Sequence, residues 1–98
     1  MVSRIEWTIN AVEKYQEIIF YYKNNDALQA AFRFEETVFG KIEQLKIHPE
    51  IGRRSNRFKT IRIVKIDNFR LMSYRVKGKT LFISNFFDVR QDPKKRPF

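Results

Sequence analysis

Basic side chains are the residues best placed for chemistry, and they concentrate in the second half of the sequence. Residues 51–98 carry 14 Lys and Arg against 3 Asp and Glu, a net charge of +11, whereas residues 1–50 carry 6 against 8. So few carboxylates leave some of these cations without an internal partner, which indicates an acidic external partner such as nucleic acid or an acidic protein. The residues that we expect to bind it are Arg62, Lys65, Arg75, Lys94 and Lys95.

Composition excludes other kinds of site. The sequence has no cysteine, which excludes disulfides and thiolate chemistry, and its one histidine, His48, is too few for a His-rich metal site. We therefore expect no metal and no cofactor. The N-terminal residues lack the apolar segment of a signal peptide, and no apolar run approaches the ~20 residues of a membrane span. A soluble, cytoplasmic protein without a membrane partner is expected.

The first elements needed to position the basic half are a short strand and a helix. Ser3–Thr8 alternates loosely and is rich in β-favouring residues, which predicts a strand. Asn10 and Glu13 have the spacing of a capping box, so we expect Asn10 to be the N-cap of a helix that ends near Asn24. Its apolar residues recur at steps of three and four along one face: Val12, Tyr15, Ile18, Ile19 and Tyr22.

A second, longer helix follows a turn of Asn and Asp residues. Asp26 is the expected N-cap, and His48-Pro49 ends the helix because the residue before proline is pushed out of the α region. One face carries small and apolar residues, which would let the two helices pack closely as a hairpin: Ala27, Ala30, Ala31, Phe34, Val38, Ile42 and Leu45.

Three strands are predicted in the basic half, after a polar loop at Glu50–Arg57. They are Lys59–Ile66, Phe69–Val76 and Thr80–Phe87, and the short turns between them indicate an antiparallel meander. The order β-α-α-β-β-β predicts an α+β fold in which a helical hairpin packs on one face of a small antiparallel sheet. At 98 residues the chain is expected to form one domain, residues 1–98.

Both faces of this predicted sheet are partly apolar, although a helical hairpin covers only one. In the last strand, strict alternation places Phe82 and Phe86 on one face, and the other face carries Leu81, Ile83 and Phe87. In the preceding strand, Met72 and Tyr74 share a face. An uncovered apolar face marks a binding site. The alternative is that the C-terminal residues or a second copy of the chain cover it.

In its order of elements and several local features, the sequence resembles the RelE/ParE superfamily, the toxins of bacterial type II toxin–antitoxin modules, which include plasmid stabilisation proteins. The resemblance covers essentially the whole chain. The residues that carry it are Trp7, Ala11, Ala30-Ala31-Phe32, Leu45, His48-Pro49, Gly52-Arg53, Ile61-Arg62-Ile63, Phe69-Arg70-Leu71, Tyr74-Arg75-Val76, Phe87-Asp88 and Arg90-Gln91-Asp92-Pro93.

The resemblance implies a growth-inhibiting toxin that a co-encoded antitoxin neutralises by wrapping around it. The uncovered apolar residues then become the expected antitoxin-binding set, namely Met72, Tyr74, Phe82 and Phe86. The target is either DNA gyrase, for ParE-like members, or mRNA at the ribosome, for RelE-like members. A homodimer and a toxin–antitoxin hetero-oligomer are both compatible with the sequence.

By motif position, the resemblance assigns Arg70 and Arg90 to the scissile phosphate if the chain cleaves RNA. Arginine is always protonated and binds phosphate oxygens in a bidentate fork. The lysine pair that some RelE members use does not align with Lys59, Arg62 and Lys65, and their C-terminal tyrosine has no counterpart. These departures favour a gyrase-directed toxin. An mRNA endonuclease and an inactive basic module that binds nucleic acid remain the alternatives.

Overall fold

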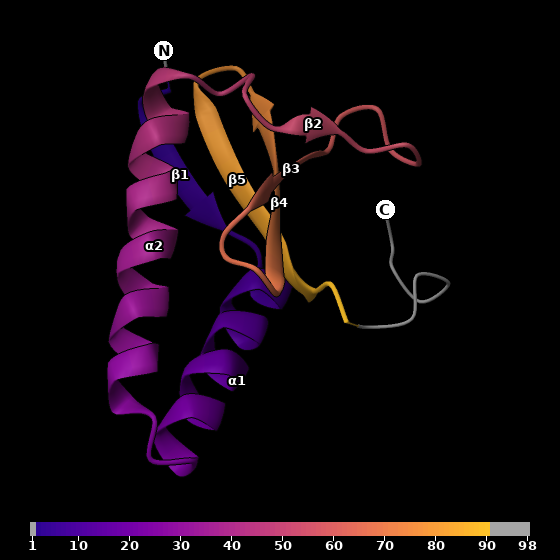
Figure 1. Cartoon of the computed structure of the whole chain (residues 1–98). Helices are drawn as coiled ribbons and strands as arrows, with labels where there is room; N and C mark the ends of the chain where they lie inside the picture. Colours follow the sequence, from indigo (N-terminus) through magenta and orange to yellow (C-terminus); the bar gives the residue numbers. More distant parts are fainter. Residues whose placement is uncertain (1, 91–98) are drawn as a thin grey trace.

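Two helices and five strands form the fold in a computed structural model, which describes residues 2–90 of the chain (Figure 1). Their bounds, in chain order, are β1 Arg4–Trp7, α1 Ile9–Asn24, α2 Leu28–Ile47, β2 Arg53–Arg54, β3 Arg62–Lys65, β4 Arg70–Lys77 and β5 Thr80–Asp88. The strands make one sheet in the order β1-β5-β4-β3-β2. The predicted α+β fold, with a helical hairpin on one face of the sheet, is confirmed.

The sheet is mixed rather than wholly antiparallel. β3, β4 and β5 form the predicted antiparallel meander, with Arg62 opposite Tyr74 and Arg70 opposite Asp88. β1 instead pairs in parallel with β5, and the long connection that a parallel pair requires contains the helical hairpin and strands β2, β3 and β4. β2 lies within the predicted loop 50–57 and adds a two-residue edge strand beside β3.

The N-cap of the first helix lies two residues before the predicted Asn10. Thr8 is the N-cap, because its Oγ1 accepts a hydrogen bond from the N–H of Ala11 at 3.1 Å, and Asn10 lies in the first turn instead. The Thr8 hydroxyl also donates to the carbonyl of Ser84 at 2.7 Å. One side chain thus caps α1 and ties its start to β5.

The second helix ends where the sequence predicts but begins without a side-chain cap. Asp26 has a φ of 54°, the left-handed conformation that Asp tolerates in tight turns, and Ala27 takes the N-cap position. The prediction that Asp26 caps the helix is wrong, because Asp26 forms part of the turn between the two helices. His48 follows the last helical residue, and the buried side chains of α2 fall on the predicted face: Ala31, Phe34, Val38, Ile42 and Leu45.

One extra residue in β5 decides which side chains face the helices. Tyr74 lies opposite Ile83, whereas Ser73 lies opposite Asn85, so Ser84 is inserted as a β-bulge. Because side chains alternate along a strand, an inserted residue exchanges the two faces for every residue after it. The faces that strict alternation predicts therefore hold only as far as Ile83.

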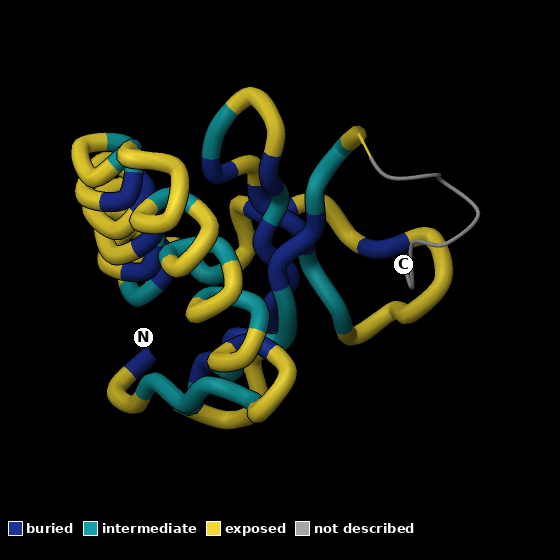
Figure 2. Tube along the Cα trace, turned by 90° about the horizontal axis from the view of Figure 1, so that it is seen from below, coloured by how far each residue is buried: buried dark blue, intermediate teal, exposed yellow. Residues whose placement is uncertain are grey.

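The bulge turns Phe86 toward the helices, where it is 1% exposed, and leaves Phe87 on the opposite face. The expectation that Phe86 and Phe82 share an uncovered face is wrong for this reason. Figure 2 shows the buried trace running through the centre of the sheet beside the helices. The sheet residues of this core are Val64, Ile66, Met72, Tyr74, Leu81, Ile83 and Phe86.

The loop after α2 is fastened to the sheet by the buried side chain of Tyr74. Its hydroxyl donates to the carbonyl of Pro49 at 2.6 Å and accepts from the N–H of Gly52 at 2.9 Å. Burial raises the pKa of this hydroxyl, which keeps its proton available for the first bond. Arg62 donates to the carbonyls of Glu50 and Gly52 at 2.9 and 2.7 Å. These bonds fix the start of β2.

We predict that Gly52→Ala destabilises the protein. A Cβ at Gly52 would lie 2.5 Å from the Tyr74 hydroxyl oxygen, and Tyr74 is fully buried and cannot give way. Overpacking of this kind costs about 1–3 kcal/mol in the free energy of unfolding, which urea denaturation measures. The control is Gly40→Ala on the exposed side of α2, where a Cβ meets nothing within 4 Å and should add about 1 kcal/mol of stability. If the two variants were equally stable, the buried Tyr74 side chain would not hold the loop against the sheet as described.

Candidate functional site

Arg70, which the resemblance assigns to phosphate binding, is buried on the helix side of the sheet. It is 7% exposed and donates to the hydroxyl of Tyr22 at 2.5 Å. Its guanidinium lies 5.1 Å from the ring centroid of Tyr22 and 5.5 Å from that of Phe34, and Asp67 is 3.9 Å away. These contacts join both helices to β4. A phosphate could reach Arg70 only if the helices moved, so its surroundings are those of a structural anchor.

Arg90, the second assigned residue, is exposed but already holds an anion. Its Nε and Nη2 donate to the two carboxylate oxygens of Asp88 at 2.9 and 2.6 Å, and its guanidinium lies 4.6 Å from the ring centroid of Phe69. The hydrogen bonds from Arg90 lower the pKa of Asp88 to about 2. Asp88 thus occupies the bidentate fork that a phosphate would otherwise take.

The expected antitoxin-binding residues divide between the two faces of the sheet. Met72, Tyr74 and Phe86 are at most 1% exposed, so the expectation that they form an open surface is wrong: the helical hairpin covers the face on which they lie. Phe82 lies on the opposite face and is half-buried. The guanidinium of Arg75, its neighbour in the register, lies 4.6 Å from its ring centroid.

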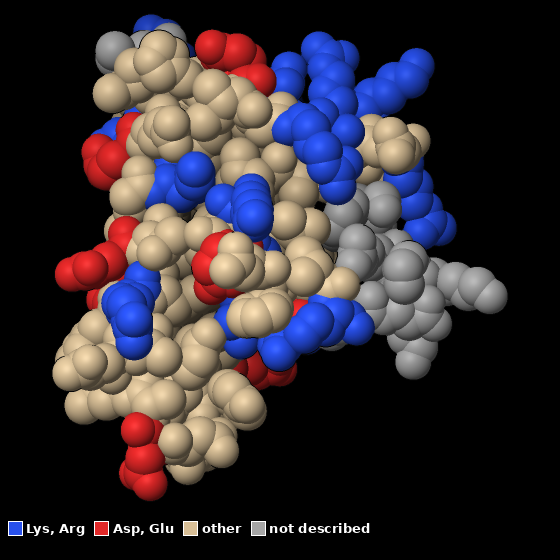
Figure 3. Space-filling model, in the orientation of Figure 1, with Lys and Arg blue, Asp and Glu red and all other residues tan. Residues whose placement is uncertain are grey.

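The other basic residues singled out from the sequence are not brought together. The guanidinium of Arg62 is hydrogen-bonded to the loop carbonyls, whereas Lys65 is exposed on β3. Lys94 and Lys95 lie outside the described residues. In Figure 3, Lys and Arg side chains gather around β2 and the loop that follows it, in a group that the sequence analysis did not single out: Arg53, Arg54, Arg57 and Lys59.

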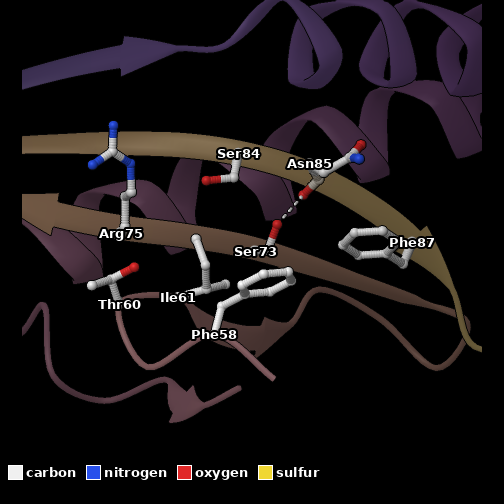
Figure 4. A pocket seen from close by; sticks show the side chains of 8 residues that line it. All are labelled: Phe58, Thr60, Ile61, Ser73, Arg75, Ser84, Asn85 and Phe87. Atoms are coloured by element: carbon white, nitrogen blue, oxygen red, sulfur yellow. Dashed lines mark hydrogen bonds between the residues drawn. The ribbon is translucent and has the colours of Figure 1, made fainter. Parts of the chain in front are cut away.

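A pocket of about 420 Å³ opens on the sheet face turned away from the helices (Figure 4). The loop between β2 and β3 reaches over this face and supplies one wall, where Ser55 Oγ accepts the N–H groups of Arg57 and Phe58 at 3.1 Å. Among the described residues of the lining, Arg75 is the one that is ionisable. The described residues of the lining are Phe58, Thr60, Ile61, Ser73, Arg75, Ser84, Asn85 and Phe87. We call this the outer-face pocket.

The sequence-based predictions missed two features, one that the sequence does not signal and one, on the helical hairpin, that it does. Nothing in the residues around Ser84 signals a bulge, so the side of the sheet taken by Asn85 and Phe87 could be found only from the structure. The helical hairpin also carries exposed apolar side chains, and these could have been found because they fall outside the predicted buried stripes. They are Ile9, Phe20, Tyr21, Leu28, Phe32 and Phe39.

Within residues 2–90, no group of three His, Cys, Asp or Glu side chains is arranged to hold a metal ion. Over the same residues, no helix has the length and apolar character needed to cross a membrane.

We predict that Tyr22→Phe destabilises the protein because it leaves the buried guanidinium of Arg70 without its hydroxyl acceptor. The loss of a hydrogen bond to a charged group costs about 1.5–3 kcal/mol in the free energy of unfolding. Tyr21→Phe is the matched control, since Tyr21 is 58% exposed, and should change stability by less than about 0.5 kcal/mol. If both variants unfold at the same urea concentration as the unsubstituted protein, Arg70 is not the anchor described above.

Comparison with known proteins gives a consistent set of relatives. A family described as the ParE toxin of the type II toxin–antitoxin system parDE matches residues 5–93. A chain from the chromosomal ParDE toxin–antitoxin system of P. aeruginosa is similar in structure, with a TM-score of 0.73 and 18% identity over 91% of this chain and 98% of that one.

Two further solved structures share the fold. A YoeB/ParE toxin from Agrobacterium tumefaciens gives a TM-score of 0.67 at 18% identity, covering 88% of this chain and 98% of that one. YafQ from E. coli gives 0.53 at 11% identity, covering 89% and 94%. A search of curated proteins gives no match. The family match spans nearly the whole chain and confirms the resemblance to the RelE/ParE superfamily. The chain belongs to the ParE toxin family of type II toxin–antitoxin systems.

Proposed function

We propose that the chain is a cytoplasmic, growth-inhibiting toxin that acts on DNA gyrase without cleaving RNA, and that a co-encoded antitoxin neutralises it. The observation that carries this proposal is the lining of the outer-face pocket. Cleavage by the 2′-hydroxyl of RNA needs one group that accepts a proton and another that returns it. Within residues 2–90, Arg75 is the one ionisable residue that lines the pocket, and arginine stays protonated throughout the physiological range.

The positions of the two assigned arginines support the same proposal. Arg70 is enclosed by Tyr22 and Phe34 on the helix side, and Arg90 is paired with Asp88 at 2.6 Å. Neither presents a free fork to a phosphate on the outer face. The match to the ParE family, rather than to a family of nucleases, agrees with a toxin that binds its target.

We expect induction of this chain in a bacterium to arrest growth, and the purified protein to inhibit supercoiling of relaxed plasmid by gyrase. The mRNA from the arrested cells, examined by mapping of 5′ ends, should lack breaks at ribosomal A sites. The physical reason is that the lining of the outer-face pocket, as far as residues 2–90 form it, has no side chain that readily accepts a proton.

An Arg90→Ala variant separates the two mechanisms in the same assays. RNA cleavage would replace the proposal if the unsubstituted protein causes breaks in mRNA that disappear in this variant, while supercoiling by gyrase stays normal in the presence of the unsubstituted protein. Unimpeded growth on induction, with the folded protein present in the cells, would contradict a toxin of either kind.

A further inference from the structure

Basic residues are densest along β2 and the loop that follows it. Residues 51–65 contain six Lys and Arg and no Asp or Glu. Four of the six form the group that gathers around β2 in Figure 3, and all four are exposed. We call this group the basic edge: Arg53, Arg54, Arg57 and Lys59. Because β2 is the outermost strand on its side of the sheet, the basic edge lies at the rim of the molecule.

The carboxylates of the chain do not balance this charge. Among the described residues, none of the ion pairs includes Arg54, Arg57 or Lys59. The carboxylate of Glu50, which precedes the group in the sequence, lies 4.0 Å from a ring nitrogen of the one histidine. Residues 91–98, outside the described part, bring one Asp against three Lys and Arg. Even if that Asp paired with one member, the basic edge would keep a net positive charge.

Holding these cations together costs folding free energy. Arg54 lies directly opposite Arg62 in the register of β2 and β3, and like charges in such a pair destabilise a sheet. The guanidinium of Arg62 is hydrogen-bonded to the carbonyls of Glu50 and Gly52, not to a carboxylate. A charge concentration that costs stability indicates a role outside folding, either in binding or in keeping other strands away from the edge.

Hydrogen bonds close the loop that carries Arg57 and Lys59. Ser55 is buried, and its Oγ accepts the N–H groups of Arg57 and Phe58 at 3.1 Å. The N–H of Ser55 donates to the carbonyl of Ile61 at 2.8 Å, which joins the two ends of the loop. Cations on a closed loop lose less freedom on binding than cations on a flexible one. Repulsion of other strands does not need this closure, so the loop favours a role in binding.

A hollow of about 340 Å³ beside β2 extends the basic edge toward α2. Lys41 of α2, Arg53 of β2 and Lys65 of β3 line it, and its other described lining residues are apolar. The ammonium of Lys41 donates to the side-chain oxygen of Gln44 at 3.2 Å, which is a neutral acceptor. Three cations from three elements, with no carboxylate in the described lining, suit a phosphate group, because its oxygens accept from several charged donors at once.

The arrangement suits the outside of a nucleic-acid duplex better than a single strand. Single strands are held by aromatic rings on which successive bases stack. The loop from Ser55 to Ile61 has one aromatic residue, Phe58, and the guanidinium of Arg57 already lies 5.8 Å from its ring centroid. Cations spread over a strand, a loop and a hollow instead match the phosphates that both strands of a duplex present along its surface.

We propose that the basic edge and the adjoining hollow bind the phosphate backbone of duplex DNA without reading its sequence. Arg54, Arg57 and Lys59 contact phosphates along the rim, and Lys41 and Lys65 bind a further phosphate at the hollow. The choice of duplex DNA rests on the proposed function, because gyrase works on duplex DNA and this contact would hold the toxin beside its target. Contacts of this kind release counterions, so the affinity falls as salt is added.

The first test measures binding of two short fluorescein-labelled DNA duplexes of unrelated sequence to the purified protein, by fluorescence polarisation at several salt concentrations. The two duplexes should bind equally. We expect Arg57→Gln/Lys59→Gln to weaken binding on the order of tenfold or more, and to reduce the slope of log affinity against log salt by about two, because two phosphate contacts are lost.

The matched control is Lys23→Gln/Arg33→Gln, which also removes one Lys and one Arg. Both residues are exposed on the helical hairpin near the turn between α1 and α2, at the opposite end of the molecule from β2 (Figure 1). Because salt screens charges over such a separation, this control should bind the duplexes nearly as well as the unsubstituted protein.

Four results would overturn the proposal. Equal weakening by both double variants would mean that net charge alone attracts the duplex. Tighter binding of a single strand than of the duplex, lost in Arg57→Gln/Lys59→Gln, would assign the basic edge to unpaired nucleic acid. Displacement of the duplex by polyglutamate at an equal concentration of charge would assign it to an acidic protein. Unchanged binding by an Arg57→Gln/Lys59→Gln protein that aggregates would assign the charges to protection of the edge strand.

A supercoiling assay separates this proposal from the proposed function. The Arg57→Gln/Lys59→Gln protein should still inhibit gyrase, but at a higher concentration than the Lys23→Gln/Arg33→Gln protein. An unsubstituted protein that inhibits gyrase without binding the duplex would overturn the DNA contact and leave the proposed function standing. An unsubstituted protein that binds the duplex through the basic edge without inhibiting gyrase would do the reverse.

Discussion

The β-bulge at Ser84 is the constraint on which the rest of the structure depends. It exchanges the faces of β5 for the residues that follow it, so Phe86 packs under the helices and Phe87 lines the outer-face pocket. Thr8, which lies between β1 and α1, supports the bulge: its N–H donates to the carbonyl of Ile83 at 3.0 Å and its hydroxyl to that of Ser84 at 2.7 Å. The start of α1, the hydrophobic core and the pocket therefore all depend on the bulge at Ser84.

Ordinary alternation along β4, which has no inserted residue, separates two arginines of that strand. Arg70 points to the helices and is enclosed by Tyr22 and Phe34, where an aromatic cage and a hydroxyl replace its hydration. Arg75 points to the outer face, stacks on Phe82 and has no carboxylate partner within the described part of the chain. The first stabilises the packing of the helices, and the second lines the outer-face pocket.

The sequence predicts the elements of this fold better than their faces. Helical periodicity locates both helices, and the turns at Asp67-Asn68 and Lys77-Gly78 locate the last strands, because these signals are local. The parallel pairing of β1 with β5 and the two-residue strand β2 depend on distant contacts that no local pattern records. The prediction of the face on which Phe86 lies is wrong for a more specific reason: strict alternation along a strand cannot foresee an inserted residue. The same error placed Phe86 in the expected antitoxin-binding set, whereas Met72 and Tyr74 lie on β4 and were assigned to the uncovered face independently of the bulge.

Thiol reactivity in the free protein tests the two faces most directly, because the sequence contains no cysteine that would interfere. With the bulge, a cysteine in Asn85→Cys lies on the outer face and should react with a maleimide much as an exposed thiol does, whereas one in Phe86→Cys should react only as fast as the protein opens. Circular dichroism of both variants is the control that they are folded. The reverse order of reactivity in folded protein would restore strict alternation and contradict the account.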